Sequence, residues 1–494
     1  MDLISYRGPG VAGGVSSGLG SAWRNSGAQK TRWWHVSKNT LQVLAPNDKI
    51  AKFIFLLPET LVNGHYRYCN EFLWPVMHDL PEFATYRPED ENSYQVFNRL
   101  MAEYIDFESE SNQEFFIQDY QLCLLPNWMS MFGHASSVFW HIPFPKNVKP
   151  EFVEPIKAIA KGLLSASALG FHCTEYADNF AAFVREYMPE YAVNSSGRVI
   201  EQVVPSRMHR RDLLGMRRRG AFVMRPELIP EADYQSRTRV LVKALGIDPE
   251  HWAALASKSA DEIGLDQSLV QLGDSDFILS VDRADYTKSV LDRVLVIDRF
   301  FEQHPEWVGS ISFVQVCGRT RPGLDAFDKY WHTCRAVWAA TNNRWRVDNW
   351  EPIKWIENPL SGQELAYLYA RAKAMLVNPV RDGLNLTAKE YVACRDSEPG
   401  VLLLSPGAGA WHELGDGSLP ADPLSHDESA ESIHRALSMQ SGEKHLRQAL
   451  MHKRLKDNTL NDWWQYFSRL KLHLHKELET REEALPENIQ RKVG

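Results

Sequence analysis

Two cations in the segment VDRADYTK have the spacing to hold a diphosphate. Arg283 and Lys288 follow directly after the apolar run 277–281. In parallel α/β sheets, ligands bind at the carboxyl ends of strands, and two cations there neutralise a departing diphosphate. The alternative is a surface turn in which Asp282 and Asp285 pair with these cations. Spacing alone favours neither interpretation.

A second polar segment, RDGLNLTAKE, follows the predicted strand 374–377 and leads into a helix. Asp382 and Gly383 form the turn, and the free backbone N–H groups at the start of the helix can hold an anion. Glu390, two turns into the helix, can accept hydrogen bonds from ribose hydroxyls. The segment is equally typical of a simple helix cap.

Three further polar side chains stand at predicted strand ends. His141 ends an apolar strand before a proline turn, Asp119 follows the strand before it, and Arg321 follows a later strand. A lone histidine is more commonly a core residue, so none of the three decides the question singly. Together with the two segments above, they predict one cleft at the carboxyl ends of five strands.

Short apolar runs alternate with longer amphipathic segments along the chain, which is typical of βαβ units. The runs are rich in β-branched and aromatic residues, as strands are. Predicted strands are 50–57, 114–117, 137–141, 277–281, 310–316, 353–356, 374–377 and 401–404, and predicted helices include 290–302, 325–341, 363–370 and 386–395. We therefore expect an α/β protein with parallel sheets in both halves of the chain.

Length and charge limit the class of protein. The chain has 494 residues, more than one compact core accommodates, so two domains are expected. Its 55 basic and 63 acidic residues give a net charge of −8, which argues against nucleic acid or an anionic membrane as a partner. The basic run 207–219 is either a solvated face or a loop that faces a phosphate or a partner.

Composition also indicates a compartment. The six cysteines stand far apart and lack the spacing of a zinc site, which is typical of free thiols in a reducing environment. No apolar stretch of about 18 residues is present, and the N-terminal MDLISYRGPG is too polar for a signal peptide. We expect a cytoplasmic protein without a membrane span, a metal site or a bound cofactor.

The N-terminal segment GPGVAGG at 8–14 matches the pattern GxGxxG. A dinucleotide-binding fingerprint also needs an acidic residue about 20 residues further on, where this chain has Lys30, Arg32 and His35. We expect instead a glycine-rich loop whose backbone can approach a phosphate closely.

These motifs together resemble one family. VDRADYTK, RDGLNLTAKEYV, WHIPFP, QDYQL, FLWP and LLLSPGAGAWHEL are similar to the motifs of the trehalose-6-phosphate synthases, the retaining glycosyltransferases of family GT20. The resemblance runs from about residue 7 to residue 464. It implies the GT-B fold, in which two Rossmann-like domains face each other across a cleft. The expected domains are 1–230 for the acceptor and 231–461 for the nucleotide-sugar donor, with a C-terminal helix at 462–494 that packs back on the first.

The resemblance assigns donor-binding and catalytic roles. Arg283 and Lys288 would hold the diphosphate, and His141 would contact the transferred glucose near the reacting centre. The other donor-binding residues that it implies are Gly13, Gly14, Leu360, Asp382, Gly383, Leu384, Asn385, Leu386 and Glu390.

On the acceptor side, the resemblance implies that Arg7 and Arg321 bind a sugar phosphate and that Asp119 contacts the sugar. The family's aromatic acceptor contact falls on His65, or on Tyr66 if the alignment has a one-residue gap. Departures from the family pattern concentrate here: Gln118 and Gln121 replace the two histidines of HDYHL, and Val36 replaces the second tryptophan of W-x-x-W.

The implied reaction is transfer of glucose from a nucleoside-diphosphate glucose to glucose 6-phosphate, which gives trehalose 6-phosphate. The nucleotide sugar and the phosphorylated acceptor are the expected partners, with no cofactor, nucleic acid or membrane. Three alternatives remain: a glucosylglycerol-phosphate synthase, a pseudo-glycosyltransferase, and a non-catalytic regulatory homologue. An arginine at position 321 is typical of the trehalose branch. The nucleobase of the donor and the oligomeric state, including a possible homo-oligomer, are left open.

Overall fold

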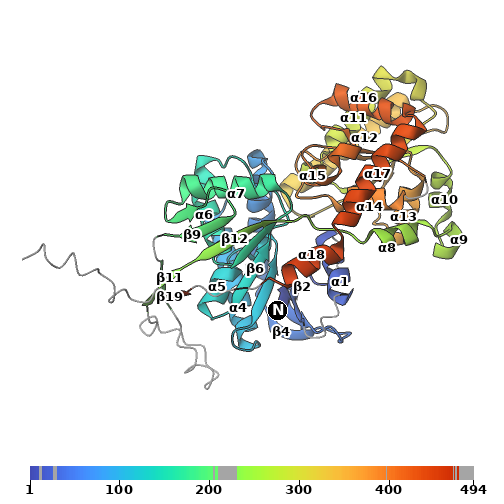
Figure 1. Cartoon of the computed structure of the whole chain (residues 1–494). Helices are drawn as coiled ribbons and strands as arrows, with labels where there is room; N and C mark the ends of the chain where they lie inside the picture. The colour runs from blue at the N-terminus through green and yellow to red at the C-terminus, as the bar shows by residue number, and fades with distance from the viewer. Residues whose placement is uncertain are drawn as a thin grey trace, which may run out of the picture.

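A computed structural model describes residues 1–9, 14–25, 31–203, 206–209, 231–395, 398–470, 472 and 476–477. The chain forms two lobes, and each lobe has one main sheet with helices on its faces (Figure 1). Gly13 and residues 210–219 of the basic run lie outside the described residues. Among the described helices, none is long and apolar enough to cross a membrane.

The first lobe contains a ten-stranded sheet in the order β4-β3-β2-β1-β5-β6-β7-β12-β9-β8. The strands from β2 to β12 in this order pair in parallel, and the strands at both edges are antiparallel. Central strands such as β7 are buried along their whole length, as parallel strands covered on both faces must be. The bounds are β1 Asp2–Ile4, β2 Trp33–Ser37, β3 Thr40–Leu44, β4 Lys52–Leu56, β5 Glu114–Gln118, β6 Ala135–Phe139, β7 Ala168–Phe171, β8 Tyr191–Val193, β9 Val199–Gln202 and β12 Arg237–Val242.

The second lobe has a six-stranded parallel sheet in the order β15-β14-β13-β16-β17-β18. Counted from β13, this is the 3-2-1-4-5-6 order of Rossmann folds. The bounds are β13 Phe277–Arg283, β14 Ser312–Gly318, β15 Ile353–Ile356, β16 Ala374–Val377, β17 Val401–Leu404 and β18 Leu419–Pro420. A small third sheet joins β10 Ser206–His209, β11 Glu231–Gln235 and β19 Lys476–Glu477.

Helices follow the strands, and several begin with local signals in the sequence. Ser361 with Glu364 at α13, and Thr459 with Asp462 at α18, form capping boxes that satisfy the free N–H groups of the first turn. The first-lobe helices are α1 Gly14–Asn25, α2 Glu59–Arg67, the π-helix η1 Tyr68–Leu73, α3 Trp74–Met77, α4 Pro88–Phe107, α5 Leu125–Met131, α6 Val153–Leu163 and α7 Thr174–Tyr187. They are followed by α8 Pro249–Ala256, α9 Ala260–Ile263, α10 Gln267–Gly273, α11 Val290–Gln303, α12 Asp325–Trp345, α13 Gly362–Arg371, α14 Leu386–Cys394, α15 Trp411–Leu414, α16 His426–Ser438, α17 Ser441–Asp457 and α18 Leu460–Ser468.

The chain crosses between the lobes twice, at adjacent places. β12 pairs in parallel with β7, so the first sheet continues to Val242, and we place the first crossing after this residue rather than at residue 230. The second crossing precedes α18, where the backbone N–H of Leu460 donates to the carbonyl of Ile247 at 2.8 Å. α18 then lies against the first lobe (Figure 1), where Phe467 stacks on Phe116 with ring centroids 5.5 Å apart. Most of the predicted helix beyond residue 470 lies outside the described residues.

Candidate active site

The polar segments that follow the strands lie at the two places where strand order reverses. In the second lobe, order reverses between β13 and β16, which precede the two motif segments VDRADYTK and RDGLNLTAKE. In the first lobe, order reverses between β1 and β5, which precede Arg7 and Asp119. Because ligands of open α/β sheets bind at such switch points, each lobe presents one half of a site.

Side-chain and backbone contacts join these strand ends into one site. Lys288, after β13, forms an ion pair with Asp382, after β16. Arg321, after β14, forms an ion pair with Asp285. A Cβ atom on Gly383 would overlap the carbonyl oxygen of His141, so the second lobe touches the first at this point and only glycine fits. These contacts bring four of the five predicted strand ends together.

Asp382 is held as a carboxylate. Its Oδ2 atom accepts from Nδ2 of Asn385 at 3.0 Å as well as from Lys288. Burial acts to raise the pKa of Asp382, but Lys288 and Asn385 outweigh burial and hold this pKa below its ordinary value. Asp382 therefore offers a charged acceptor oxygen, the group that hydrogen-bonds sugar hydroxyls well.

Arg283 is the cation of this site that remains available. Its side chain is exposed, and it has no hydrogen-bond or ion-pair partner among the residues that the structure describes. Enclosure by protein, and then the positive charges of Arg321 and Arg7, lower the pKa of its guanidinium. Arg283 is thus a solvent-accessible cation near two others, and cations that crowd one another favour an anionic ligand.

The surface-turn alternative for VDRADYTK does not hold in this structure. Asp282 pairs with the buried Arg293 at 2.6 Å, and Asp285 pairs with Arg321. Neither aspartate neutralises Arg283 or Lys288 through an ion pair in the described residues. The two cations of the motif are thus left to face the cleft and Asp382.

Arg293, on α11, is a supporting residue that sequence reasoning missed. Its guanidinium is fully buried and donates to Asn378 Oδ1 at 2.6 Å, Gln315 Oε1 at 3.1 Å and the carbonyl of Lys288 at 3.2 Å. It therefore fixes the turn that carries Lys288. An arginine inside an amphipathic helix pattern gives no sequence signal for this role.

The start of α14 is shaped to present backbone N–H groups. Asn385 has φ 77° and ψ 90°, and its side chain caps the helix by accepting from the N–H of Ala388 at 3.2 Å. One turn further, Glu390 accepts from the hydroxyl of Tyr369 at 3.2 Å, and burial raises the pKa of Glu390 to about 7. Leu384 is buried, Leu386 is half-buried at the helix start, and Leu360 lies half-buried before α13.

Asp119 and His141 come together at the edge of the first sheet. Oδ1 of Asp119 accepts from the backbone N–H of His141 at 3.3 Å, and burial raises the pKa of this carboxyl to about 7. Burial lowers the pKa of His141 to about 3, so the imidazole is neutral, and its Nε2 donates to Oε1 of Gln118 at 2.9 Å. Asp119 has φ 73° and ψ 173°, a strained conformation that only glycine adopts readily.

Backbone strain gathers at this site. Eight non-glycine residues of the described chain have positive φ, and four of them, Asp119, Ser289, Arg321 and Asn385, lie in the segments that form the cleft. Strained residues of this kind persist where the surrounding contacts hold them, and they are enriched at functional sites. This is an indication of the site that is independent of the motifs.

Arg321 joins the two lobes. Its Nε donates to Oδ1 of Asn70 at 2.6 Å, and its guanidinium lies 4.3 Å from the ring centroid of Trp74 and 4.7 Å from that of Phe327. Nε1 of Trp74 in turn donates to Asp285 at 3.3 Å. The arginine is nearly buried, and the stacked rings fix its plane.

On the acceptor side, the structure separates the two aromatic candidates. His65 is fully buried, stacks on Phe97 with centroids 3.8 Å apart, and its Nε2 lies 3.0 Å from the carbonyl of Gln121. Burial lowers its pKa to about 4. His65 is therefore a core residue and not an acceptor contact, because the surrounding aromatic rings enclose it.

Tyr66 is the half-buried neighbour, and its side chain is close enough to Arg321 to raise the pKa of that guanidinium, although less than Asp285 does. Arg7 is exposed after β1, and its carbonyl accepts from the Ser5 hydroxyl at 2.6 Å. Gly14 begins α1. The one-residue gap that places Tyr66 at the acceptor contact is thus the interpretation that the geometry favours.

Comparison with known proteins shows which family has this architecture. The model of the family described as glycosyltransferase family 20 matches residues 22–471. The chain belongs to this family. As a family member it is a glycosyltransferase, and its two-lobed arrangement is the GT-B fold of the solved trehalose-phosphate synthases.

Three known proteins are similar to this glycosyltransferase in sequence or structure. A glucosylglycerol-phosphate synthase from Synechocystis is 29% identical over 84% of this chain and 81% of its own length. A bifunctional trehalose-6-phosphate synthase/phosphatase from Thermoproteus tenax is 30% identical over 81% of this chain but only 51% of its own length. The crystal structure of a UDP-forming trehalose-phosphate synthase from Burkholderia xenovorans, in complex with glucose 6-phosphate, is 25% identical, with a TM-score of 0.80 over 95% of this chain and 98% of that one.

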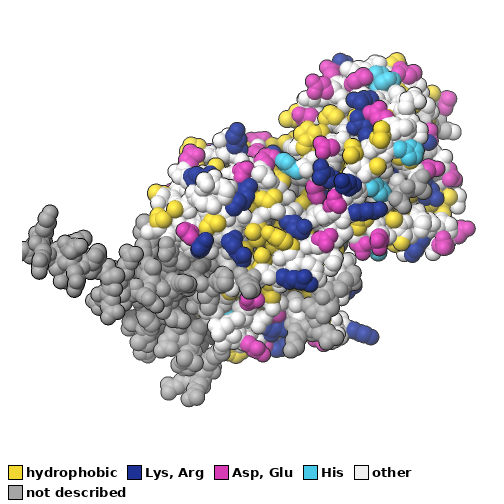
Figure 2. Space-filling model, viewed as in Figure 1, with side chains coloured by type: hydrophobic (Ala, Val, Ile, Leu, Met, Phe, Trp, Pro, Cys, Tyr) yellow, Lys and Arg dark blue, Asp and Glu magenta, His cyan; other side chains and the backbone are white. Residues whose placement is uncertain are grey.

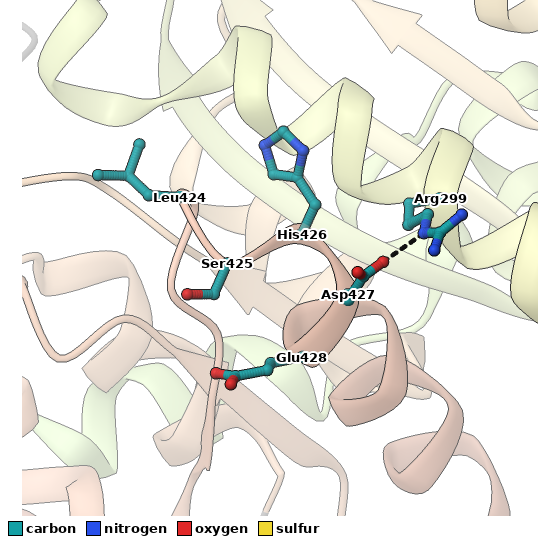
Figure 3. A pocket seen from close by; sticks show the side chains of 6 residues that line it. All are labelled: Arg299, Leu424, Ser425, His426, Asp427 and Glu428. Carbon is teal, nitrogen blue, oxygen red and sulfur yellow. Dashed lines mark hydrogen bonds and ion pairs between the residues drawn. The ribbon is translucent and has the colours of Figure 1, made fainter.

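A surface pocket of about 470 Å³ lies away from this site, between α11 and the start of α16. Arg299, His426 and Asp427 are among its lining residues, and Arg299 pairs with Asp427 (Figure 3). It contains no residue of the glycosyltransferase motifs. We therefore assign the active site from the converging strand ends and not from this pocket.

Proposed function

We propose that the chain is a retaining glucosyltransferase that transfers glucose from UDP-glucose to glucose 6-phosphate and forms trehalose 6-phosphate. The observation that carries the proposal is that Arg7 of the first lobe and Arg321 of the second both lie close enough to Arg283 for their charges to lower its pKa. Such cations suit two phosphate-bearing substrates. The Burkholderia relative, named UDP-forming and solved with glucose 6-phosphate, supports these substrates.

In the proposed reaction, the bond between the glucose C1 atom and the donor diphosphate breaks, and a bond from C1 to the acceptor hydroxyl oxygen forms on the same face. The proton of that hydroxyl passes to the leaving diphosphate, so no protein nucleophile is needed. Arg283 and Lys288 stabilise the charge that develops on the diphosphate. Asp382 orients the glucose hydroxyls, and Glu390 receives the ribose.

Acceptor binding in this proposal uses both lobes. Arg7 and Arg321 hold the phosphate, while Asp119 and Tyr66 contact the sugar. Arg321 must then exchange part of its interaction with Asp285 for the phosphate, which links acceptor binding to the position of the second lobe. Unphosphorylated glucose is accordingly expected to be a poor acceptor.

Glycerol 3-phosphate is the second candidate acceptor. The Synechocystis relative, a glucosylglycerol-phosphate synthase, aligns with most of both chains.

The deciding experiment measures UDP release and product identity with UDP-glucose and either acceptor, in the presence of EDTA. We expect kcat/KM to be higher with glucose 6-phosphate, a trehalose 6-phosphate product, and no effect of EDTA on turnover. A higher kcat/KM with glycerol 3-phosphate selects the second candidate. If no UDP is released with either acceptor or by hydrolysis of UDP-glucose alone, the chain is a non-catalytic homologue.

A further inference from the structure

Arg321, which binds the acceptor phosphate in the proposed reaction, is held by an amide side chain of the opposite lobe. Asn70 is buried in the π-helix η1 of the first lobe. Its Oδ1 atom accepts from Nε of Arg321 at 2.6 Å. Because Nε of an arginine can only donate, the oxygen of the amide must be the atom that faces it. The two residues stand 251 positions apart, so sequence spacing does not predict the contact.

The same amide holds two other parts of the acceptor side. Nδ2 of Asn70 donates to the carbonyl of Tyr66 at 2.8 Å. The hydroxyl of Tyr120, the residue after Asp119, donates to Oδ1 at 3.5 Å. Both ends of the amide therefore have partners, which fixes its orientation. One side chain thus connects Tyr66, the segment that carries Asp119, and Arg321.

The local backbone of Asn70 departs from an ordinary α-helix. The backbone N–H of Trp74 bonds to the carbonyl of Cys69, five residues back, where an α-helix bonds four residues back. Single π-turns of this kind are frequent at functional sites. Asn70 and Trp74, four residues apart, both reach Arg321, because the guanidinium lies 4.3 Å from the centroid of the tryptophan ring. This face of the segment is therefore shaped around the arginine.

Arg321 has one charged partner and one neutral partner. It pairs with Asp285 through Nη1 and with Asn70 through Nε. A phosphate that replaces part of the ion pair can leave the bond at Nε in place, since the two partners use different nitrogen atoms. A neutral amide also leaves the positive charge of the arginine to the phosphate, whereas a second carboxylate would compete for it.

We propose that Asn70 is a positioning residue for the acceptor phosphate. It fixes Nε of Arg321 and so keeps the guanidinium aimed while Asp285 is exchanged for the phosphate. The inference rests on the proposed role of Arg321 in binding a phosphorylated acceptor. Asn70 acts through this arginine and not by contact with the substrate. Preference for a phosphorylated acceptor then depends on a residue of the lobe opposite Arg321.

The test measures steady-state kinetics of the full chain with UDP-glucose and with either glucose 6-phosphate or glucose as acceptor. Asn70→Ala should raise KM for glucose 6-phosphate by about tenfold, the effect of losing one hydrogen bond to a charged group. KM for UDP-glucose and kcat/KM for glucose should be nearly unchanged, because neither depends on a contact between Arg321 and a phosphate. A general loss of folded protein would instead lower the rate with every substrate.

Two further variants isolate the contact. Asn70→Asp can still accept from Nε but adds a carboxylate that competes with the phosphate, so KM for glucose 6-phosphate should also rise. In an Arg321→Ala background, Asn70→Ala should change this KM by less than about twofold, because the two residues act as one unit.

The matched control is Asn98→Ala. Asn98 is a buried asparagine of α4 whose Nδ2 likewise donates to a carbonyl four residues back, that of Tyr94 at 3.0 Å. Among the described contacts it has none with Arg321. Asn98→Ala should therefore leave the preference for glucose 6-phosphate over glucose unchanged.

Equal weakening of glucose and glucose 6-phosphate by Asn70→Ala, or a full tenfold effect in the Arg321→Ala background, overturns the proposal. Turnover with glycerol 3-phosphate instead would contradict the proposed acceptor but not this inference. The same variants are then compared with glycerol 3-phosphate and glycerol. If the chain turns over neither phosphate, calorimetric binding of glucose 6-phosphate in the presence of UDP replaces KM in the comparison.

Discussion

Among single residues, Arg283 offers the sharpest test of donor binding, because its guanidinium has no ion-pair partner in the described structure whose loss would confuse the result. Arg283→Ala should lower kcat with UDP-glucose by about 10²–10³-fold, since loss of one preorganised charge at a transition state costs about 2.7–4 kcal/mol. The matched control is Arg319→Ala, an exposed arginine paired with Asp328. Steady-state kinetics that show equal rates in both variants would contradict the role of Arg283.

Asp119 allows function and stability to be separated at one position. Replacing it with glycine relieves backbone strain, which should stabilise the folded protein by about 1–3 kcal/mol. The glycine also gives the unfolded chain more freedom, which offsets about 0.4–1 kcal/mol of this gain. Asp119→Gly should therefore be at least as stable as the wild type in denaturant unfolding, yet lose most of its acceptor kcat/KM. Asn112→Gly, at an exposed residue with φ 60°, is the control that should keep full activity. A destabilised Asp119→Gly protein would show that the strain is not released.

At the scale of elements, Glu390 on α14 should make both the stability of the protein and its affinity for UDP depend on pH. Burial raises the pKa of Glu390 to about 7, above its ordinary 4.5, so the folded protein binds this proton more tightly than the unfolded chain. The contribution of Glu390 to stability is therefore full below about pH 4.5 and is lost as the pH rises through 7. Binding of ribose needs the ionised carboxylate, so the affinity for UDP should show the opposite trend and weaken as the pH falls through 7.

Calorimetric titration of UDP between pH 5.5 and about 8.5 checks this expectation. Glu390→Gln should reduce the pH dependence of the UDP affinity and of the stability by the part that Glu390 contributes, because the amide does not titrate, while the part that Asp119 contributes to the stability profile remains. Asp274→Asn, which removes an exposed carboxyl at the end of α10, is the control and should change neither profile. A wild-type UDP affinity that is constant over this range would contradict the raised pKa.

Elements that depend on local pattern were predicted well from the sequence. The predicted strands 277–281, 374–377 and 401–404 are present as β13, β16 and β17, and their motif segments stand at strand ends as expected. The run 50–57 forms β4, but as an antiparallel edge strand, because its pairing is decided by β3 and not by its own composition. Pattern predicts which segments become strands, while neighbours decide how they pair.

Contacts between distant segments could not be predicted in this way. Arg321 meets Asn70, and the carbonyl of Asp382 accepts from Tyr176, across more than 200 residues of sequence. The distinction between His65 and Tyr66 depends on which of two adjacent helical side chains faces the core. That orientation follows from packing against Phe97, which no motif records.

For the whole molecule, apolar packing and polar contacts both join the lobes: Phe83 of the first lobe stacks on Tyr286 of the second with ring centroids 4.3 Å apart. Glu175 of α7 pairs with Arg381 before α14, and with His412 of α15 at 3.4 Å. The hydrogen bond from His412, and then Arg381, lower the pKa of Glu175 to about 2. Charges of both signs are interspersed over the visible face of the two lobes (Figure 2), so no broad single-sign field on this face drives closure. Specific pairs such as this one therefore add to the apolar packing between the lobes.

Because the proposed substrates contact both lobes, loosening this closure should weaken the binding of both at once. Glu175→Ala removes partly exposed pairs worth about 1 kcal/mol, which corresponds to about a fivefold change in an equilibrium constant. We expect KM for donor and acceptor to rise together by about this factor with kcat nearly unchanged, since apparent affinity scales with the closed fraction. Small-angle scattering should show a larger radius of gyration that returns to the wild-type value when UDP and glucose 6-phosphate are added.

Glu302→Ala, which removes pairs with Arg299 and Arg344 inside the second lobe, is the control. A rise in KM for one substrate alone would mean that Glu175 acts at a subsite and not on the closure of the lobes.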